Sequence, residues 1–75
     1  MKIKLNRLEI INNLYTEEEL SDLSIMESFY HIRKLKALSE SLESGYIKID
    51  KTNQYNQVYS NKYEIWFNLN EYELI

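Results

Sequence analysis

The sequence has no cysteine and no proline, and its 75 residues include one glycine, one histidine and one tryptophan. Without cysteine, neither a disulfide nor a thiolate metal site can stabilise the fold. A single histidine excludes a multi-histidine metal site, and a single glycine excludes a glycine-rich phosphate loop. No serine lies in a G-x-S-x-G turn. We therefore predict a protein that is not an enzyme, with no catalytic residues, no metal site and no cofactor.

Seventy-five residues are enough for one domain with a small core, which we place at 1–75. A core of this size without cross-links often gains stability from a partner or from a second copy of itself, so a homodimer is one expectation. The uncharged apolar runs are too short to span a membrane, and no secretory signal follows Met1. We expect a cytoplasmic protein without membrane contact.

The net charge is −3, but the charged residues are unevenly distributed. The first eight residues carry three basic side chains, residues 9–30 carry six acidic and no basic ones, and residues 31–36 carry three basic ones. The acidic excess does not favour general binding to nucleic acid.

The clearest periodic pattern lies between Ser24 and Gly45. Apolar residues recur there at steps of three or four, which places them on one face of a helix: Ile25, Phe29, Ile32, Leu35, Leu38 and Leu42. Ser24 and Glu27 form a capping box, and Gly45 suits a left-handed C-terminal cap. The pattern predicts a helix over 25–44 with that apolar face on the core and His31, Arg33, Lys34 and Lys36 in solvent.

Two shorter helices are predicted before it. Asn6 with Glu9 favours a helix start, and the apolar spacing extends that helix over 7–14, although a strand hairpin also fits. Thr16 with Glu19 forms a second capping box, which predicts a helix over 17–23 with a bend near Ser24, although one continuous helix over 17–44 also fits. Residues 1–5 alternate apolar and basic side chains, as a short edge strand does.

After Gly45 the apolar period changes from about 3.6 to two, which is typical of strands. We predict a sheet of two to three strands, with strands over 46–50 and 63–69 and either a middle strand or an ordered loop over 54–60. An acidic tail that contains Glu71 and Glu73 follows. Helices followed by an antiparallel sheet define an α+β domain of two packed layers.

Trp66 is the most informative single residue for function. Its neighbours Ile65 and Phe67 occupy the core face of the last predicted strand, so Trp66 points to the other side. An exposed tryptophan carries much of the binding energy at many protein interfaces, and we expect Tyr46 and Tyr59 to extend its surface. A second candidate surface is the acidic run at the predicted helix start, which consists of Glu17, Glu18, Glu19 and Asp22.

The small size, the acidity, the eight asparagines and seven tyrosines, and the lack of catalytic motifs resemble small proteins encoded by phages and mobile elements. Anti-CRISPR and other anti-defence inhibitors belong to this group. The resemblance implies a protein that inhibits a host protein by stoichiometric binding in the host cytoplasm, with the acidic run as a mimic of nucleic-acid phosphates.

A second resemblance is to winged-helix proteins. The stretch E-L-S-D-L-S-I-M-E-S-F-Y-H-I-R-K-L, residues 19–35, is similar to a helix-turn-helix, and the strands of 46–69 would be the wing. That resemblance implies a DNA-binding regulator in which Lys51 and Lys62 of the wing contact phosphates. Its major-groove residues would be Ser28, His31, Arg33 and Lys34.

Overall fold

The computed structural model describes residues 1–15 and 29–75, and these residues confirm the predicted α+β class. The elements in chain order are β1 (Lys2–Leu5), α1 (Arg7–Leu14), α3 (Phe29–Ser44), β2 (Ile47–Lys48), β3 (Lys51–Thr52), β4 (Val58–Ser60), β5 (Ile65–Phe67), the 3₁₀ helix η1 (Leu69–Glu71) and β6 (Tyr72–Leu74). The predicted helix over 17–23 and the start of the predicted helix at 25 lie outside the described residues.

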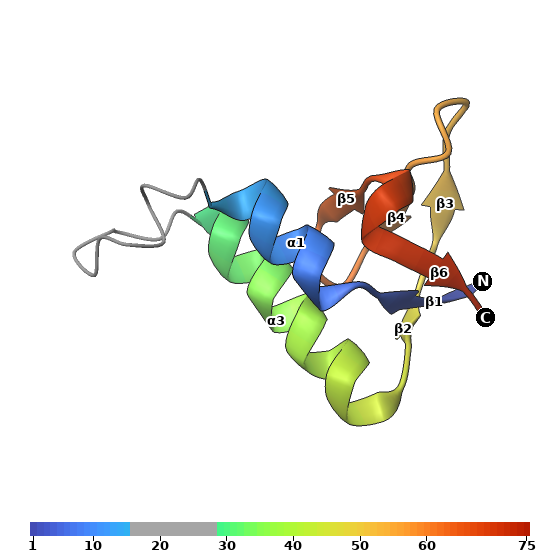
Figure 1. The fold of residues 1–75 in the computed structure, drawn as a ribbon. Helices are drawn as coiled ribbons and strands as arrows, with labels where there is room; N and C mark the ends of the chain where they lie inside the picture. Colours follow the sequence, from blue (N-terminus) through green and yellow to red (C-terminus); the bar gives the residue numbers. More distant parts are fainter. Residues whose placement is uncertain (16–28) are drawn as a thin grey trace.

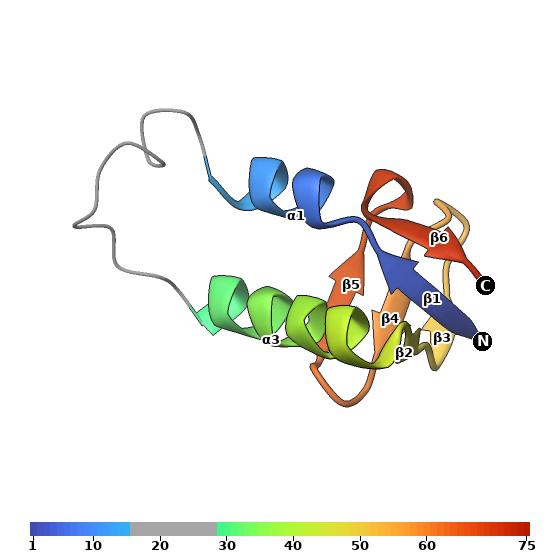
Figure 2. The same cartoon turned by 60° about the horizontal axis from the view of Figure 1, so that its bottom comes forward.

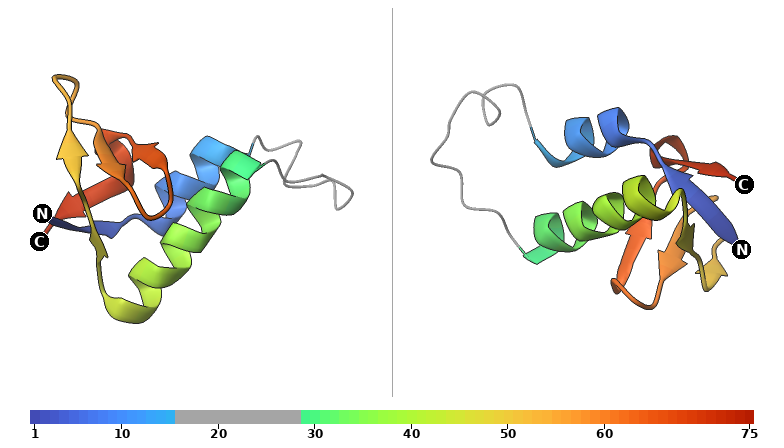
Figure 3. Two further views of the ribbon diagram at one scale, coloured as in Figure 1. Left: turned by 180° about the vertical axis from the view of Figure 1, so that it is seen from behind. Right: turned by 90° about the horizontal axis from the view of Figure 1, so that it is seen from below.

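The strands form two three-stranded antiparallel sheets, with the order β2-β1-β6 in sheet A and β3-β4-β5 in sheet B (Figure 1). The predicted N-terminal strand is confirmed as β1, but its expected position at a sheet edge is wrong, because β1 is the central strand of sheet A. The expected acidic tail is also wrong, because η1 and β6 occupy it. The two ends of the chain lie side by side, where the Ile75 N–H donates to the Lys2 carbonyl (Figures 1 and 3).

Each predicted strand contains an observed strand, but the observed ones are shorter. The chain passes from sheet A to sheet B between β2 and β3. There Asp50 and Lys51 both face Tyr59: the Asp50 N–H donates to the Tyr59 carbonyl, and Lys51 is the register partner of Tyr59. When two residues of one strand lie opposite a single residue of the neighbouring strand, the first strand bends at that point. Such bends form the corners at which a chain passes from one sheet to another.

The two described helices lie side by side, and the strands lie toward the end of the pair on the right of Figure 2. Helix α1 has the predicted bounds, and the Glu9 N–H donates to the Asn6 side chain at 3.2 Å as the N-cap pattern indicates. Gly45 follows α3 with a φ of 84°, which confirms the left-handed cap. Helices and both sheets share one apolar core, formed by Ile3, Leu5, Ile10, Leu14, Ala37, Leu38, Ile47, Ile49, Val58, Ile65 and Phe67.

The buried face of α3 is rotated from the predicted one. Its fully buried residues are Lys34, Ala37, Leu38 and Ser41, whereas Phe29 is 82% exposed and Leu42 59% exposed. The polar members of this face have partners in the core, and the buried Ser41 hydroxyl accepts the Leu5 N–H at 2.9 Å. Apolar spacing alone could not reveal these partners.

Candidate functional site

The outer face of sheet B carries the strongest candidate site. Its central residues are cross-strand partners on the three strands: Lys51 on β3, Tyr59 on β4 and Trp66 on β5. The Tyr59 and Trp66 rings are only partly buried. Because Ile65 and Phe67 are buried, their neighbour Trp66 points away from the core, as the alternation predicts.

The three central residues pack against one another. The Tyr59 and Trp66 ring centroids lie 5.1 Å apart, and the rings are tilted by 49°. The Lys51 ammonium lies 4.6 Å from the Tyr59 centroid and 5.8 Å from that of Trp66, within the range of a cation–π interaction. These contacts hold the two aromatic rings in a fixed position beside a single positive charge.

A row of side-chain amides borders the aromatic pair. The Asn53 Nδ2 group donates to Gln57 Oε1 at 2.8 Å, and Gln57 Nε2 donates to Asn68 Oδ1 at 2.9 Å. The Asn53 side chain also fixes the β3–β4 turn, because its Oδ1 accepts the N–H groups of Tyr55 and Gln57. We call the outer surface formed by Lys51, Tyr59, Trp66, Asn53, Gln57 and Asn68 the sheet B face.

Tyr46 belongs to a different surface. It immediately precedes β2 of sheet A, it is 38% exposed, and the Lys2 ammonium lies 4.5 Å from its ring centroid. The structure thus joins Tyr59 to Trp66 and places Tyr46 with the lysines of sheet A. The acidic candidates Glu17, Glu18, Glu19 and Asp22 lie outside the described residues.

Lys34 does not face solvent, so its predicted position on an open DNA-reading surface is wrong. It is 1% exposed, and its ammonium lies 2.7 Å from both carboxylate oxygens of Glu71, which is 0% exposed. The Asn68 N–H donates to the same carboxylate at 2.7 Å, and the Asn6 N–H donates to the Glu71 carbonyl at 2.8 Å. Lys34 therefore joins α3 to η1 inside the protein.

The other residues of the DNA-binding alternative have mixed positions. Arg33 is exposed and lies 3.8 Å from Glu64, whereas His31 is partly buried with its ring 5.2 Å from that of Tyr15. Ser28 and the expected helix-turn-helix bend lie outside the described residues. Of the two wing lysines, Lys62 forms an ion pair with Glu40 of α3 and Lys51 belongs to the sheet B face.

A polar cluster joins α3 to the β4–β5 turn. The Lys62 ammonium and the Tyr63 hydroxyl both donate to Glu40 Oε1, the latter at 2.7 Å. These two hydrogen bonds, that from Lys62 first, lower the pKa of Glu40 below its ordinary value.

We expect this cluster to make stability depend on acidic pH. A carboxyl group whose pKa is lower in the folded than in the unfolded protein stabilises the folded state at pH values above its pKa in the unfolded protein, about 4.3. This contribution is lost as the pH falls through the pKa of the group in the folded protein. Urea unfolding of the wild type and Glu40→Gln should therefore show a small excess of wild-type stability at pH 7 that disappears in acid. An excess that persists unchanged in acid would contradict this assignment.

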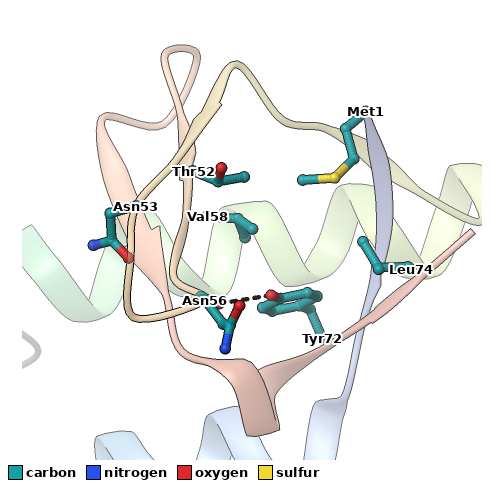
Figure 4. Close-up of a pocket in the computed structure, with 7 residues that line it drawn as sticks. All are labelled: Met1, Thr52, Asn53, Asn56, Val58, Tyr72 and Leu74. Carbon is teal, nitrogen blue, oxygen red and sulfur yellow. Dashed lines mark hydrogen bonds between the residues drawn. The ribbon is translucent and has the colours of Figure 1, made fainter.

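A small cleft lies between the β3–β4 turn and β6 (Figure 4). It has a volume of about 160 Å³ and is lined by Met1, Thr52, Asn53, Asn56, Val58, Tyr72 and Leu74. The Tyr72 hydroxyl donates to the Asn56 carbonyl at 2.6 Å and holds the turn against β6. The cleft is far smaller than a typical ligand pocket, which occupies about 300–1,000 Å³.

Sequence reasoning missed the position of Lys51 beside the aromatic pair. It also missed the amide row formed by Asn53, Gln57 and Asn68. Alternation around Val58 and Phe67 indicates that Gln57 and Asn68 share a face with Tyr59 and Trp66. Their adjacency depends on strand register, which the residue pattern of this chain does not specify.

Residues 1–15 and 29–75 contain no cluster of histidine, cysteine or acidic side chains that could hold a metal ion. Among the same residues, no helix is long and apolar enough to cross a membrane. No family model, no curated protein and no solved structure matches the chain.

Proposed function

We propose that this protein is a non-catalytic protein-binding module that uses the sheet B face. The observation that carries the proposal is the packed Tyr59–Trp66 pair, partly exposed and covered at one end by Lys51. Tryptophan and tyrosine are enriched at the centres of protein interfaces, where charged residues are depleted. The ordered amide row beside the rings supplies hydrogen-bonding groups of the kind found at an interface rim.

Fixed side chains also favour binding energetically. A side chain that is already held in one position loses less conformational entropy when a partner covers it. Contacts within the sheet hold Tyr59, Trp66 and Gln57 in this way. A stoichiometric inhibitor needs no more than such a surface, so we retain inhibition of a host protein by a phage or mobile-element product as the cellular role. In a homodimer, a second copy of the protein would cover a surface of this kind in place of the host protein.

DNA binding through α3 is the less favoured function. The alternative requires a row of open side chains on α3, and Lys34 is withdrawn from that row into an ion pair with Glu71. Arg33, the exposed basic residue next to it, lies near Glu64. A duplex-binding regulator would in addition show an affinity that falls steeply with salt concentration.

The proposal is tested by capture of the partner with matched variants. Tagged wild-type protein, Trp66→Ala and Leu42→Ala serve as baits in extracts of the host cells, and bound proteins are identified by mass spectrometry. Leu42 is the control because it is an exposed apolar residue, 59% exposed, on α3. We expect wild type and Leu42→Ala to capture the same protein at a defined stoichiometry and Trp66→Ala to lose it.

Unchanged capture by Trp66→Ala and by Tyr59→Ala would exclude the sheet B face as the binding surface. Circular dichroism of each bait shows that a lost interaction does not result from unfolding.

A further inference from the structure

The outer face of sheet A is rich in lysine. Lys2 on β1 and Lys48 on β2 are direct cross-strand partners, and Lys4 lies two residues along β1 from Lys2. All three are exposed. Among the described residues, none of them forms an ion pair with a carboxylate, although Glu73 is the register partner of Lys4.

The pairing of Lys2 with Lys48 is unfavourable for the free protein. Like charges directly opposite each other on neighbouring strands destabilise a sheet. The Lys2 ammonium also lies 4.5 Å from the Tyr46 ring centroid, which offsets part of this repulsion by a cation–π interaction. An anionic group between the two ammonium groups would remove the repulsion.

The lysines of sheet A are continuous with the sheet B face. Lys48 and Lys51 lie on the one segment that bends from sheet A into sheet B, and Lys51 covers the Tyr59 ring. A ligand that occupies the sheet B face and continues past the bend therefore meets Lys51, then Lys48 and Lys2. None of these three lysines has an ion-pair partner within residues 1–15 and 29–75.

We infer that Lys2, Lys48 and Lys51 bind an acidic segment of the protein partner, an inference that rests on the protein-binding function proposed above. A peptide with spaced carboxylates fits this surface better than a nucleic acid does. Asp50 lies between Lys48 and Lys51 along the chain, and Glu73 lies opposite Lys4. A continuous phosphate backbone would be repelled by these carboxylates, whereas a peptide can place uncharged residues beside them. The aromatic rings beside the lysines are tilted and already covered by ammonium groups, so they do not form a flat stacking surface.

The test uses two defined probes, a short peptide whose glutamates are separated by uncharged residues and an oligothymidylate of equal formal charge. Each is titrated into ¹⁵N-labelled protein while the backbone amide signals are followed. We expect the peptide to cause saturable shifts at Lys2, Lys48 and Lys51 that weaken with added salt. Tighter binding of the oligothymidylate, with quenching of the Trp66 fluorescence, would show a nucleic-acid surface instead and would overturn the inference. The absence of saturable shifts with the peptide would also overturn it.

Charge reversal with a matched control separates local from bulk electrostatics. We expect Lys2→Glu/Lys48→Glu to weaken peptide binding about tenfold or more, because two attractions become repulsions. The control Arg7→Glu/Lys36→Glu makes the same change in net charge at two exposed positions outside sheet A, and we expect less than about a threefold loss. Equal losses in both variants would overturn the inference.

Two further comparisons distinguish a failure of the acidic-segment inference from a failure of the proposed protein-binding surface. Lys2→Glu alone turns the Lys2–Lys48 repulsion into attraction, so this variant should be at least as stable as the wild type and should still bind more weakly. If Trp66→Ala loses the captured partner while Lys2→Glu/Lys48→Glu retains it fully, the acidic-segment inference is wrong and the protein-binding function stands. If Trp66→Ala and Tyr59→Ala both retain the partner, the proposed use of the sheet B face is wrong.

Discussion

Lys34→Met and Glu71→Gln, made one at a time, should each lower the free energy of unfolding by about 3–5 kcal/mol, the usual cost of leaving one member of a buried ion pair alone. Neither charge can be hydrated where it lies, because Lys34 is 1% exposed and Glu71 is 0% exposed. A domain of this length has a total stability of only about 4–11 kcal/mol. Either substitution therefore removes a large part of it.

The two substitutions should be strongly non-additive. In Lys34→Met/Glu71→Gln neither charge remains, and the glutamine oxygen can still accept the Asn68 N–H that Glu71 now accepts. Replacing both members of a buried ion pair is often close to neutral. We therefore expect the double variant to be more stable than either single variant.

Urea unfolding of the four proteins provides the double-mutant cycle that measures this coupling. Additive losses would show that the 2.7 Å contacts between Lys34 and Glu71 contribute little as a pair. The cycle would then assign the cost to packing in α3 and to the capping of η1 separately.

The ion pair also shows where sequence reasoning fails in this fold. The buried residues of α3 are Lys34, Ala37, Leu38 and Ser41, and the apolar spacing correctly predicts only Leu38 among them. A periodicity argument that counts large apolar side chains selects Phe29 and Leu42 instead, which are exposed. The helix, its end at Ser44 and its Gly45 cap were all predictable, because they depend on local chemistry.

The sheets show the same division between local and long-range information. The period-two alternation of Ile65, Trp66 and Phe67 correctly predicts which side chains enter the core. The central position of β1 depends on pairing with β2 and β6, which are both far from β1 in the sequence. The residue pattern places Glu71 in an acidic tail for the same reason, because its partner Lys34 is 37 residues away in the sequence.

For the candidate site, the sequence identified Trp66 and Tyr59 but not their surroundings. Solvent-facing aromatic residues are visible from alternation, because their buried neighbours point the other way. The lysine beside the rings and the amide row come from strand register and from the bend at Asp50 and Lys51. No local pattern in the sequence specifies that register.

Trp66→Ala and Phe67→Ala should separate binding from folding, because the two residues are neighbours on β5 with side chains on opposite faces. Phe67 is 0% exposed within the core, so its truncation should cost about 3–5 kcal/mol of stability through the cavity it leaves. Trp66 is partly exposed and contacts Tyr59 and Lys51, so its loss should cost only about 1 kcal/mol.

The binding measurement should give the reverse order. We expect Trp66→Ala to lose at least about 2 kcal/mol of partner binding, roughly thirtyfold in Kd, as a central interface tryptophan does. Phe67→Ala, studied where it remains folded, should bind within about threefold of the wild type, since Phe67 does not reach the surface. Calorimetric titration of the captured partner measures both values. A Trp66→Ala variant as unstable as Phe67→Ala, with unchanged affinity, would show that Trp66 belongs to the fold and not to the interface.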